Sequence, residues 1–195
     1  MPSTLTLLHQ SMTGMSSKVL ILLDADVVIH LFKADKISLL NMLFLGRIRM
    51  LDIVLKELLE NRTVREIVEN LFIYRQVEEF KFPTTSNSTL LNEYFALAST
   101  INGSGERACL VYCKHYRNII ASSNTTDIVP YCLANGIAYL TTLDFFMIAV
   151  KKRKMSAREA NNLIQKITKN SESYLCCKSI EEHEKKHFDP QKLLY

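Results

Sequence analysis

The sequence predicts an α/β fold of three layers, in which helices cover both faces of a central parallel sheet of four to five strands. In short apolar runs such as KVLILL at residues 18–23, apolar and polar residues do not alternate. This pattern is typical of strands that are buried on both faces of a sheet. Helical stretches of ten or more residues separate these runs, which is typical of βαβ units. The 195 residues, about half of them apolar, suffice for one domain with its own core.

Five strands are expected in chain order, at residues 18–23, 47–53, 77–82, 118–121 and 137–140. The third stops at Pro83 and is expected at a sheet edge, because proline cannot donate to a β-ladder. One helical stretch should run from the first strand to about residue 45, and others should connect the later strands. Gly136 is expected to end a helix as a C′ glycine, and TTLD at 141–144 to begin the next.

The domain organisation is expected to be simple. Residues 1–17 are expected to be a flexible leader, residues 18–168 the α/β domain, and residues 169–195 a C-terminal helical tail. No apolar run approaches the roughly 20 residues of a membrane span, and the start lacks the pattern of a signal peptide. We therefore expect a cytoplasmic protein that does not enter the membrane.

The net charge and the cysteines limit which binding partners, metal sites and cell compartments are expected. A formal net charge of +4 permits a nucleic-acid partner without requiring one. The five cysteines are odd in number and none has CxxC spacing, which argues against a disulfide framework or a Cys-rich zinc site and fits a reducing compartment. His183 and His187 are spaced i, i+4 in the tail, a spacing that could bind a metal, but without a recognised Cys partner they are expected to be solvated.

The candidate site follows from where polar residues stand relative to strands. Open parallel sheets bind ligands beyond the carboxyl ends of their strands. Asp24 and Asp26 follow the first strand, and the SSN triplet at 122–124 follows the fourth. A carboxylate after a buried strand is costly unless it is paired, although capping of the next helix is the simpler explanation for either aspartate.

Four segments together resemble the PIN domain family, in its toxin-like ribonuclease branch. LLDADVVIHLFKADKISLL resembles the family's opening, VLKELLE its second motif, and GSGERACLVYCKHY its third; the stretch from IIASSNTT to LIQKI resembles its C-terminal half. The resemblance covers about residues 18–168. It implies a Mg²⁺- or Mn²⁺-dependent endoribonuclease, with Asp24, Glu57 and Glu106 as catalytic acids.

The resemblance also implies partners: an RNA substrate, a small antitoxin protein laid across the acidic pocket, and a second copy of the chain in a homodimer. Hard cations prefer carboxylate oxygen, which makes Asp24 and Glu106 the primary metal ligands, with Asn124 beside them. Supporting roles fall to Asp26, Ser123 and Asp127, and substrate contacts to Lys33 and Arg107. Taken alone, Glu57 lies on a charged helical stretch that suits a solvent-facing residue, and Glu106 in a first helical turn suits the helix dipole.

One departure leaves the activity open. Where the family usually has one or two aspartates after the fourth strand, Ser123 and Asn124 are expected to occupy the acidic positions. The alternative to an enzyme is therefore a catalytically degenerate PIN-like module that binds RNA or a protein partner. A nucleotide-binding α/β domain is a third reading, but no Gly-rich phosphate loop follows the first strand.

Overall fold

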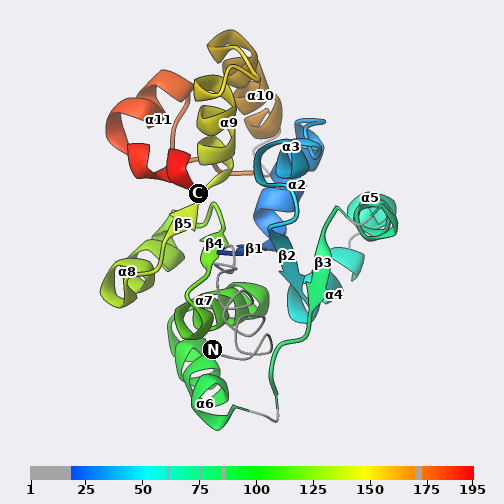
Figure 1. Cartoon of the computed structure of the whole chain (residues 1–195), viewed down its shortest axis with the longest axis vertical. Helices are drawn as coiled ribbons and strands as arrows, with labels where there is room; N and C mark the ends of the chain where they lie inside the picture. Colours follow the sequence, from blue (N-terminus) through cyan, green and yellow to red (C-terminus); the bar gives the residue numbers. More distant parts are fainter. Residues whose placement is uncertain (1–18, 61, 75, 85–86, 170–172) are drawn as a thin grey trace, which may run out of the picture.

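The computed structural model describes residues 19–195 except 61, 75, 85–86 and 170–172 (Figure 1). The expected leader, 1–17, lies outside the described residues. In the described part, five parallel strands form one sheet in the order β3-β2-β1-β4-β5. They are β1 (Ile21–Leu23), β2 (Ile48–Leu51), β3 (Glu78–Phe80), β4 (Ile119–Ala121) and β5 (Tyr139–Leu140). The predicted parallel α/β sheet is confirmed, and β3 lies at its edge as expected.

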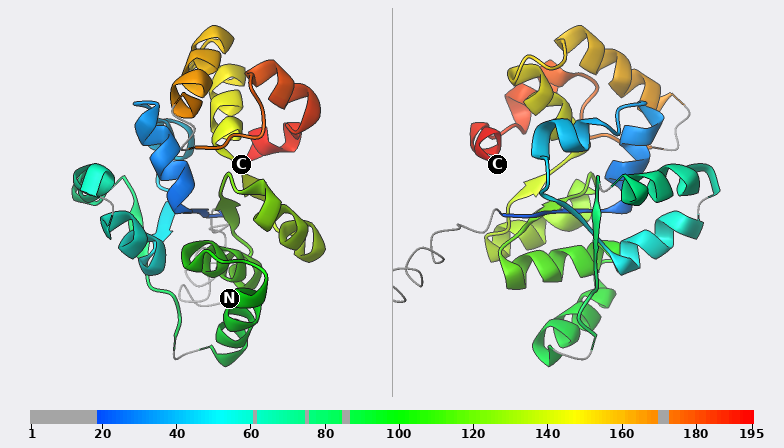
Figure 2. Two further views of the ribbon diagram at one scale, coloured as in Figure 1. Left: turned by 180° about the vertical axis from the view of Figure 1, so that it is seen from behind. Right: turned by 45° about the vertical axis from the view of Figure 1, so that its right-hand side comes forward.

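Helices cover both faces of the sheet (Figures 1 and 2). One layer contains α2 (Ala25–Lys33), α3 (Leu39–Phe44), α9 (Thr142–Lys151), α10 (Ala157–Thr168) and α11 (Ile180–Lys186), with the 3₁₀ turn η2 (Pro190–Leu194). The other contains α4 (Asp52–Glu60), α5 (Arg62–Ile73), α6 (Ser88–Ala96), η1 (Leu97–Ser99), α7 (Ser104–Tyr116) and α8 (Thr125–Asn135). Strands β1, β2 and β4 are almost fully buried between these layers. This is expected of strands whose apolar residues do not alternate with polar ones.

The helical stretch expected after β1 is two helices rather than one. The chain leaves α2 through a turn in which Asp35 adopts a left-handed backbone with φ of 56°. The backbone N–H of Lys36 bonds the carbonyl of Leu31, which closes the end of α2 before α3 begins. A non-glycine residue in this conformation leaves no clear sequence signal. The helix ends at Gly136 and Thr141 are as predicted: Gly136 is left-handed, and Thr141 forms a capping box with Asp144.

The strand order places a crevice between β1 and β4. From β1 the chain builds β2 and β3 on one side, then returns to build β4 and β5 on the other. Ligands bind at such a switch point, beyond the carboxyl ends of the strands. The register pairs Leu23 with Ala121, and the backbone N–H of Asp24 still bonds the carbonyl of Ala121. Asp24 and Ser122 therefore emerge side by side at this point.

Candidate active site

Asp24 is held at the start of α2. Its backbone is extended, with φ of −89° and ψ of 161°, and its carboxylate accepts a 2.9 Å hydrogen bond from the N–H of Ala25. This makes Asp24 a helix cap, so the simpler explanation of its position is correct as far as it goes. Asp24 is also buried, with only 7% of the residue exposed. A helix cap does not require burial beside other acids, so capping does not explain the whole arrangement.

Asp26 points back to the chain that leaves β4. Its Oδ2 accepts hydrogen bonds from the N–H of Ser123 at 2.7 Å and from the hydroxyl of Ser122 at 3.4 Å. Its Oδ1 is buried and has no hydrogen-bond partner among the described residues. A buried carboxylate oxygen without a donor is costly, so this atom marks a place for a ligand or a cation.

Glu106 joins the two aspartates from the first turn of α7. Its Oε1 accepts from the Ser122 hydroxyl at 3.3 Å, and its Oε2 accepts from the amide Nδ2 of Asn124 at 3.2 Å. The same amide donates to Asp127 at 2.9 Å. Asp24 and Asp26 at the start of α2 thus converge with Glu106 of α7, and Asn124 and Asp127 lie beside them. We call Asp24, Asp26 and Glu106 the acidic cluster.

The acidic cluster is electrostatically unfavourable without a cation. Burial, followed by the charges of Asp26 and Glu106, raises the pKa of Asp24 well above its usual range. Burial raises the pKa of Asp26 to about 6, and burial with the charge of Asp127 raises the pKa of Glu106 to about 7. Desolvation and like charges both disfavour the ionised forms, and both would be relieved by a bound cation.

Ser122 and Ser123 differ in a way that the sequence did not reveal. The Ser122 hydroxyl faces the acidic cluster, whereas the Ser123 hydroxyl bonds Thr142 at 2.9 Å and accepts from its backbone N–H. That Ser123 occupies an acidic position of the family stays a prediction, but its side chain points to Thr142 rather than to the acidic cluster, because consecutive residues leaving a strand point to opposite sides. For Ser122, the only sequence signal of a place in the site was its position directly after β4.

Glu57 lies at the N-terminus of α7. Its Oε1 accepts from the Ser104 hydroxyl at 2.5 Å and from the N–H of Gly105 at 3.0 Å. A Cβ at Gly105 would lie 2.8 Å from Glu57 Oε2, so the glycine permits this approach. Glu57 is half-buried rather than solvent-facing, and it caps and positions the helix that carries Glu106.

The two residues expected to contact substrate are both engaged within the protein. Lys33 donates to the hydroxyl of Ser173 at 2.9 Å. The guanidinium of Arg107 donates to the carbonyls of Ile101 and Asn102 and lies over the ring of Tyr94, 5.1 Å from its centroid. Arg107 therefore stabilises the loop before α7, whereas Lys33 connects α2 to the segment beside the site.

A cavity of about 250 Å³ opens beside Asp26. It is lined by Asp26, His30, Ser123, Asn124, Thr125, Thr126, Ser173 and Tyr174. His30 bonds the Thr142 hydroxyl at 3.0 Å, and burial together with the charge of Lys33 lowers the pKa of His30 to about 4, which keeps it neutral near pH 7. Tyr174 is exposed, with 76% of the residue open to solvent.

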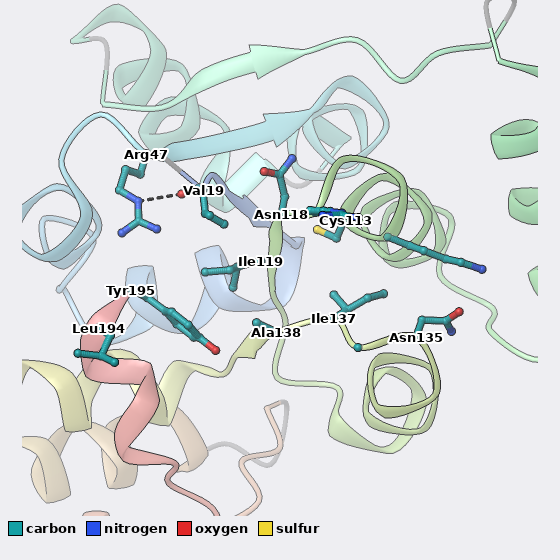
Figure 3. A pocket seen from close by; sticks show the side chains of 13 residues that line it. Val19, Arg47, Cys113, Asn118, Ile119, Asn135, Ile137, Ala138, Leu194 and Tyr195 are labelled. Atoms are coloured by element: carbon teal, nitrogen blue, oxygen red, sulfur yellow. Dashed lines mark hydrogen bonds between the residues drawn. The ribbon is translucent and has the colours of Figure 1, made fainter. Parts of the chain in front are cut away.

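A larger cavity of about 600 Å³ lies at the opposite end of the sheet (Figure 3). Val19, Arg47, Asn118 and Ala138, which precede the strands, line it, and Arg47 donates to the carbonyl of Val19 at 2.8 Å. None of its described lining residues is an aspartate or a glutamate. Size alone therefore does not identify the functional site, and the chemistry favours the smaller cavity beside the acidic cluster.

The C-terminal tail contributes His183 and Lys192 to a second cluster of buried polar side chains, which centres on Asp144 of α9. Asp144 is fully buried; its Oδ1 pairs with His183 Nε2 at 2.9 Å and its Oδ2 with Lys192 Nζ at 2.8 Å. His183 is 1% exposed, so the expectation that it is solvated is wrong; His187 is exposed. The side chains of the tail thus reach into the domain, with α11 and η2 packed on α9.

No family model matches this chain, and comparison with the curated proteins returns no match either. The PIN resemblance therefore stays a prediction. Among the described residues, no helix is both long and apolar enough to cross a membrane.

Proposed function

We propose that the protein is a metal-dependent endoribonuclease whose active site is the acidic cluster at the carboxyl ends of β1 and β4. One observation carries the proposal: three carboxylates from two separate segments, the start of α2 and the first turn of α7, converge at the switch point of a parallel sheet, and Asp26 Oδ1 is buried there without a donor among the described residues. Structural capping explains Asp24 alone, but it does not explain why the buried Asp24 and Glu106 lie together with the half-buried Asp26.

The donor set suits Mg²⁺ or Mn²⁺. Both are hard cations that take carboxylate oxygen and retain several waters. One oxygen from each of Asp24, Asp26 and Glu106 cannot be chosen so that all three lie within 4.8 Å of one another. An ion at this site would therefore be held partly through water, which Mg²⁺ favours. Asp24 and Glu106 are the primary ligands, with Asp26 as the third acid and Asn124 at the rim.

A bound Mg²⁺ or Mn²⁺ supplies positive charge to the phosphoryl oxygens of the scissile bond and makes water more acidic. The chain itself orients the site. Ser123 N–H fixes the Asp26 carboxylate, and Asn124 fixes that of Glu106. Glu57 acts at one remove, since it holds the start of α7 and so the position of Glu106.

RNA as substrate is supported by the cavity beside the cluster. The exposed ring of Tyr174 stands at its edge and offers a face on which a base can stack, and Lys33 lies next to it through Ser173. A small antitoxin protein across this cavity and a homodimer follow from the resemblance only, as does a cytoplasmic location.

The test is cleavage of a mixed RNA pool by the purified chain with Mn²⁺, with Mg²⁺ and with EDTA. Asp24→Asn should abolish metal-dependent cleavage and leave the circular dichroism spectrum unchanged, because the amide oxygen can still accept from Ala25 N–H. Asp35→Asn is the matched control: it removes an exposed acid, and asparagine tolerates the left-handed backbone there. Cleavage that survives in Asp24→Asn would refute the site.

The second candidate is a catalytically degenerate module that binds RNA. It is favoured by Ser122, Ser123 and Asn124, which bring no charge to the end of β4. RNA binding without cleavage under any metal, by a protein that also fails to bind Mn²⁺, would establish it over the enzyme.

A further inference from the structure

We propose that the C-terminal tail binds a structural zinc ion through Cys176, Cys177, His187 and the buried Nδ1 of His183. This site is separate from the acidic cluster and does not depend on the proposed ribonuclease activity. It also differs from what cysteine spacing predicts, since no CxxC pair is present and the two cysteines are adjacent.

Three ligand atoms are already close together. The sulfurs of Cys176 and Cys177 and a ring nitrogen of His187 all lie within 4.8 Å of one another. Ligand atoms about 2.3 Å from a tetrahedral zinc are separated by roughly 3.7 Å, so movements of about 1 Å or less would complete the set. Thiolate and imidazole are the donors that zinc prefers, and they are unsuited to Mg²⁺.

His183 supplies an independent observation. Its side chain is 1% exposed and its Nδ1 has no hydrogen-bond partner among the described residues. Its Nε2 bonds Asp144, a carboxylate that can only accept, so the neutral ring that binds a metal would carry its proton on Nε2 and present the lone pair of Nδ1. A carboxylate–histidine pair of this kind commonly orients a zinc-bound imidazole.

His183 would supply the fourth ligand from the same side of α11 as His187. His183 and His187 are spaced i, i+4 on α11, their rings are stacked with centroids 6.1 Å apart, and they line one cavity of about 220 Å³ together with Cys176. His183 Nδ1 is not in the set within 4.8 Å, so its ring would shift toward the metal. Two thiolates would neutralise Zn²⁺, which avoids a net charge beside Lys192 in the same cavity.

A zinc ion here would tie the start of the tail to the end of α11. Cys176 and Cys177 precede α11, and His187 ends it. A seven-residue helix is too short to be stable by itself, so its position must come from tertiary contacts. The ion would hold α11 against α9; the two helices lie side by side in Figure 2, and His183 contacts Asp144 there. It would also anchor the chain that carries Tyr174 at the cavity beside Asp26.

The experiment uses the full chain, purified under a metal-free phosphine reductant, stripped of metal, and titrated with Co²⁺ and then Zn²⁺. We expect one equivalent of Co²⁺ to produce a thiolate charge-transfer band and strong visible bands typical of tetrahedral coordination, and Zn²⁺ to displace it. Cys177→Ser should lose the charge-transfer intensity of one thiolate, and His187→Gln should weaken Co²⁺ binding. Zn²⁺ should raise the melting temperature of the wild type and raise that of Cys177→Ser less.

Matched controls separate this site from other effects. Cys113→Ala removes a thiol from the core, His115→Gln removes a histidine that pairs with Glu93, and Asp24→Asn disables the acidic cluster; all three should keep the Co²⁺ spectrum. Circular dichroism confirms that each variant is folded. No Co²⁺–thiolate band in the wild type, or a full spectrum retained by Cys177→Ser, would overturn the proposal.

Discussion

Replacing Asp26 by asparagine should stabilise the metal-free protein above neutral pH. The side chain keeps its shape, and its amide oxygen can still accept from Ser123 N–H. The change removes one of three clustered carboxylates that repel each other, and its new N–H₂ replaces the buried oxygen that lacks a donor among the described residues.

The magnitude follows from the pKa. A rise of the Asp26 pKa from 3.8 to about 6 corresponds to at most about 3 kcal/mol of destabilisation at pH 8, at about 1.4 kcal/mol per pKa unit. Because the pKa in the folded protein is raised, protonation favours the folded state, and the penalty disappears as the pH falls through 6 toward 4. We therefore expect a variant that is more stable by about 2–3 kcal/mol at pH 8, or roughly 4–12 °C in melting temperature, and nearly equal to the wild type at pH 4.5.

The assay is urea and thermal denaturation in EDTA at pH 8, 6.5 and 4.5, then at pH 8 with saturating Mn²⁺. Mn²⁺ should reverse the order, because a cation that binds only the folded state stabilises the wild type more. Glu69→Gln, at an exposed acid, is the control and should change little. A variant no more stable than the wild type at pH 8 in EDTA, or a gain independent of pH, would refute the reasoning.

Two further predictions concern the helix ends around the site. Glu57→Gln should retain stability within about 1 kcal/mol because the amide oxygen still caps α7, whereas Glu57→Ala should cost about 1–2 kcal/mol by urea denaturation; equal losses in both would contradict the capping role. Asp144→Asn should cost roughly 3–5 kcal/mol, since it leaves His183 and Lys192 without their buried partner. Burial opposes ionisation of Asp144, but its bond from His183 and the charge of Lys192 lower its pKa below 3.8, so the Asp144 contribution should persist down to about pH 4 and fade below it in acid denaturation. Denaturation of Asp144→Asn at the wild-type midpoint would rule this out.

The sequence was sufficient for the layered fold and for part of the site. Non-alternating apolar runs separated by helices predicted the parallel sheet, and the position after a buried strand predicted Asp24. Residues in a first helical turn, such as Glu106, were also predictable, because local periodicity determines where helices begin. The break between α2 and α3 was missed, since it depends on Asp35 in a conformation that many residues can be forced to adopt.

The tertiary structure decided which of these residues meet. Asp24, Asp26 and Glu106 come together only because the strand order brings β1 beside β4 and packs α7 on them. Which of Ser122 and Ser123 faces the acids depends on how the chain leaves β4, a matter of one residue in register. His183 was expected to be solvated in the tail, yet it is buried, because α11 packs on α9 and Asp144 of α9 accepts its hydrogen bond. Local patterns therefore determined the elements, whereas long-range packing determined burial and proximity, and the chemistry of both candidate sites depends on those two quantities.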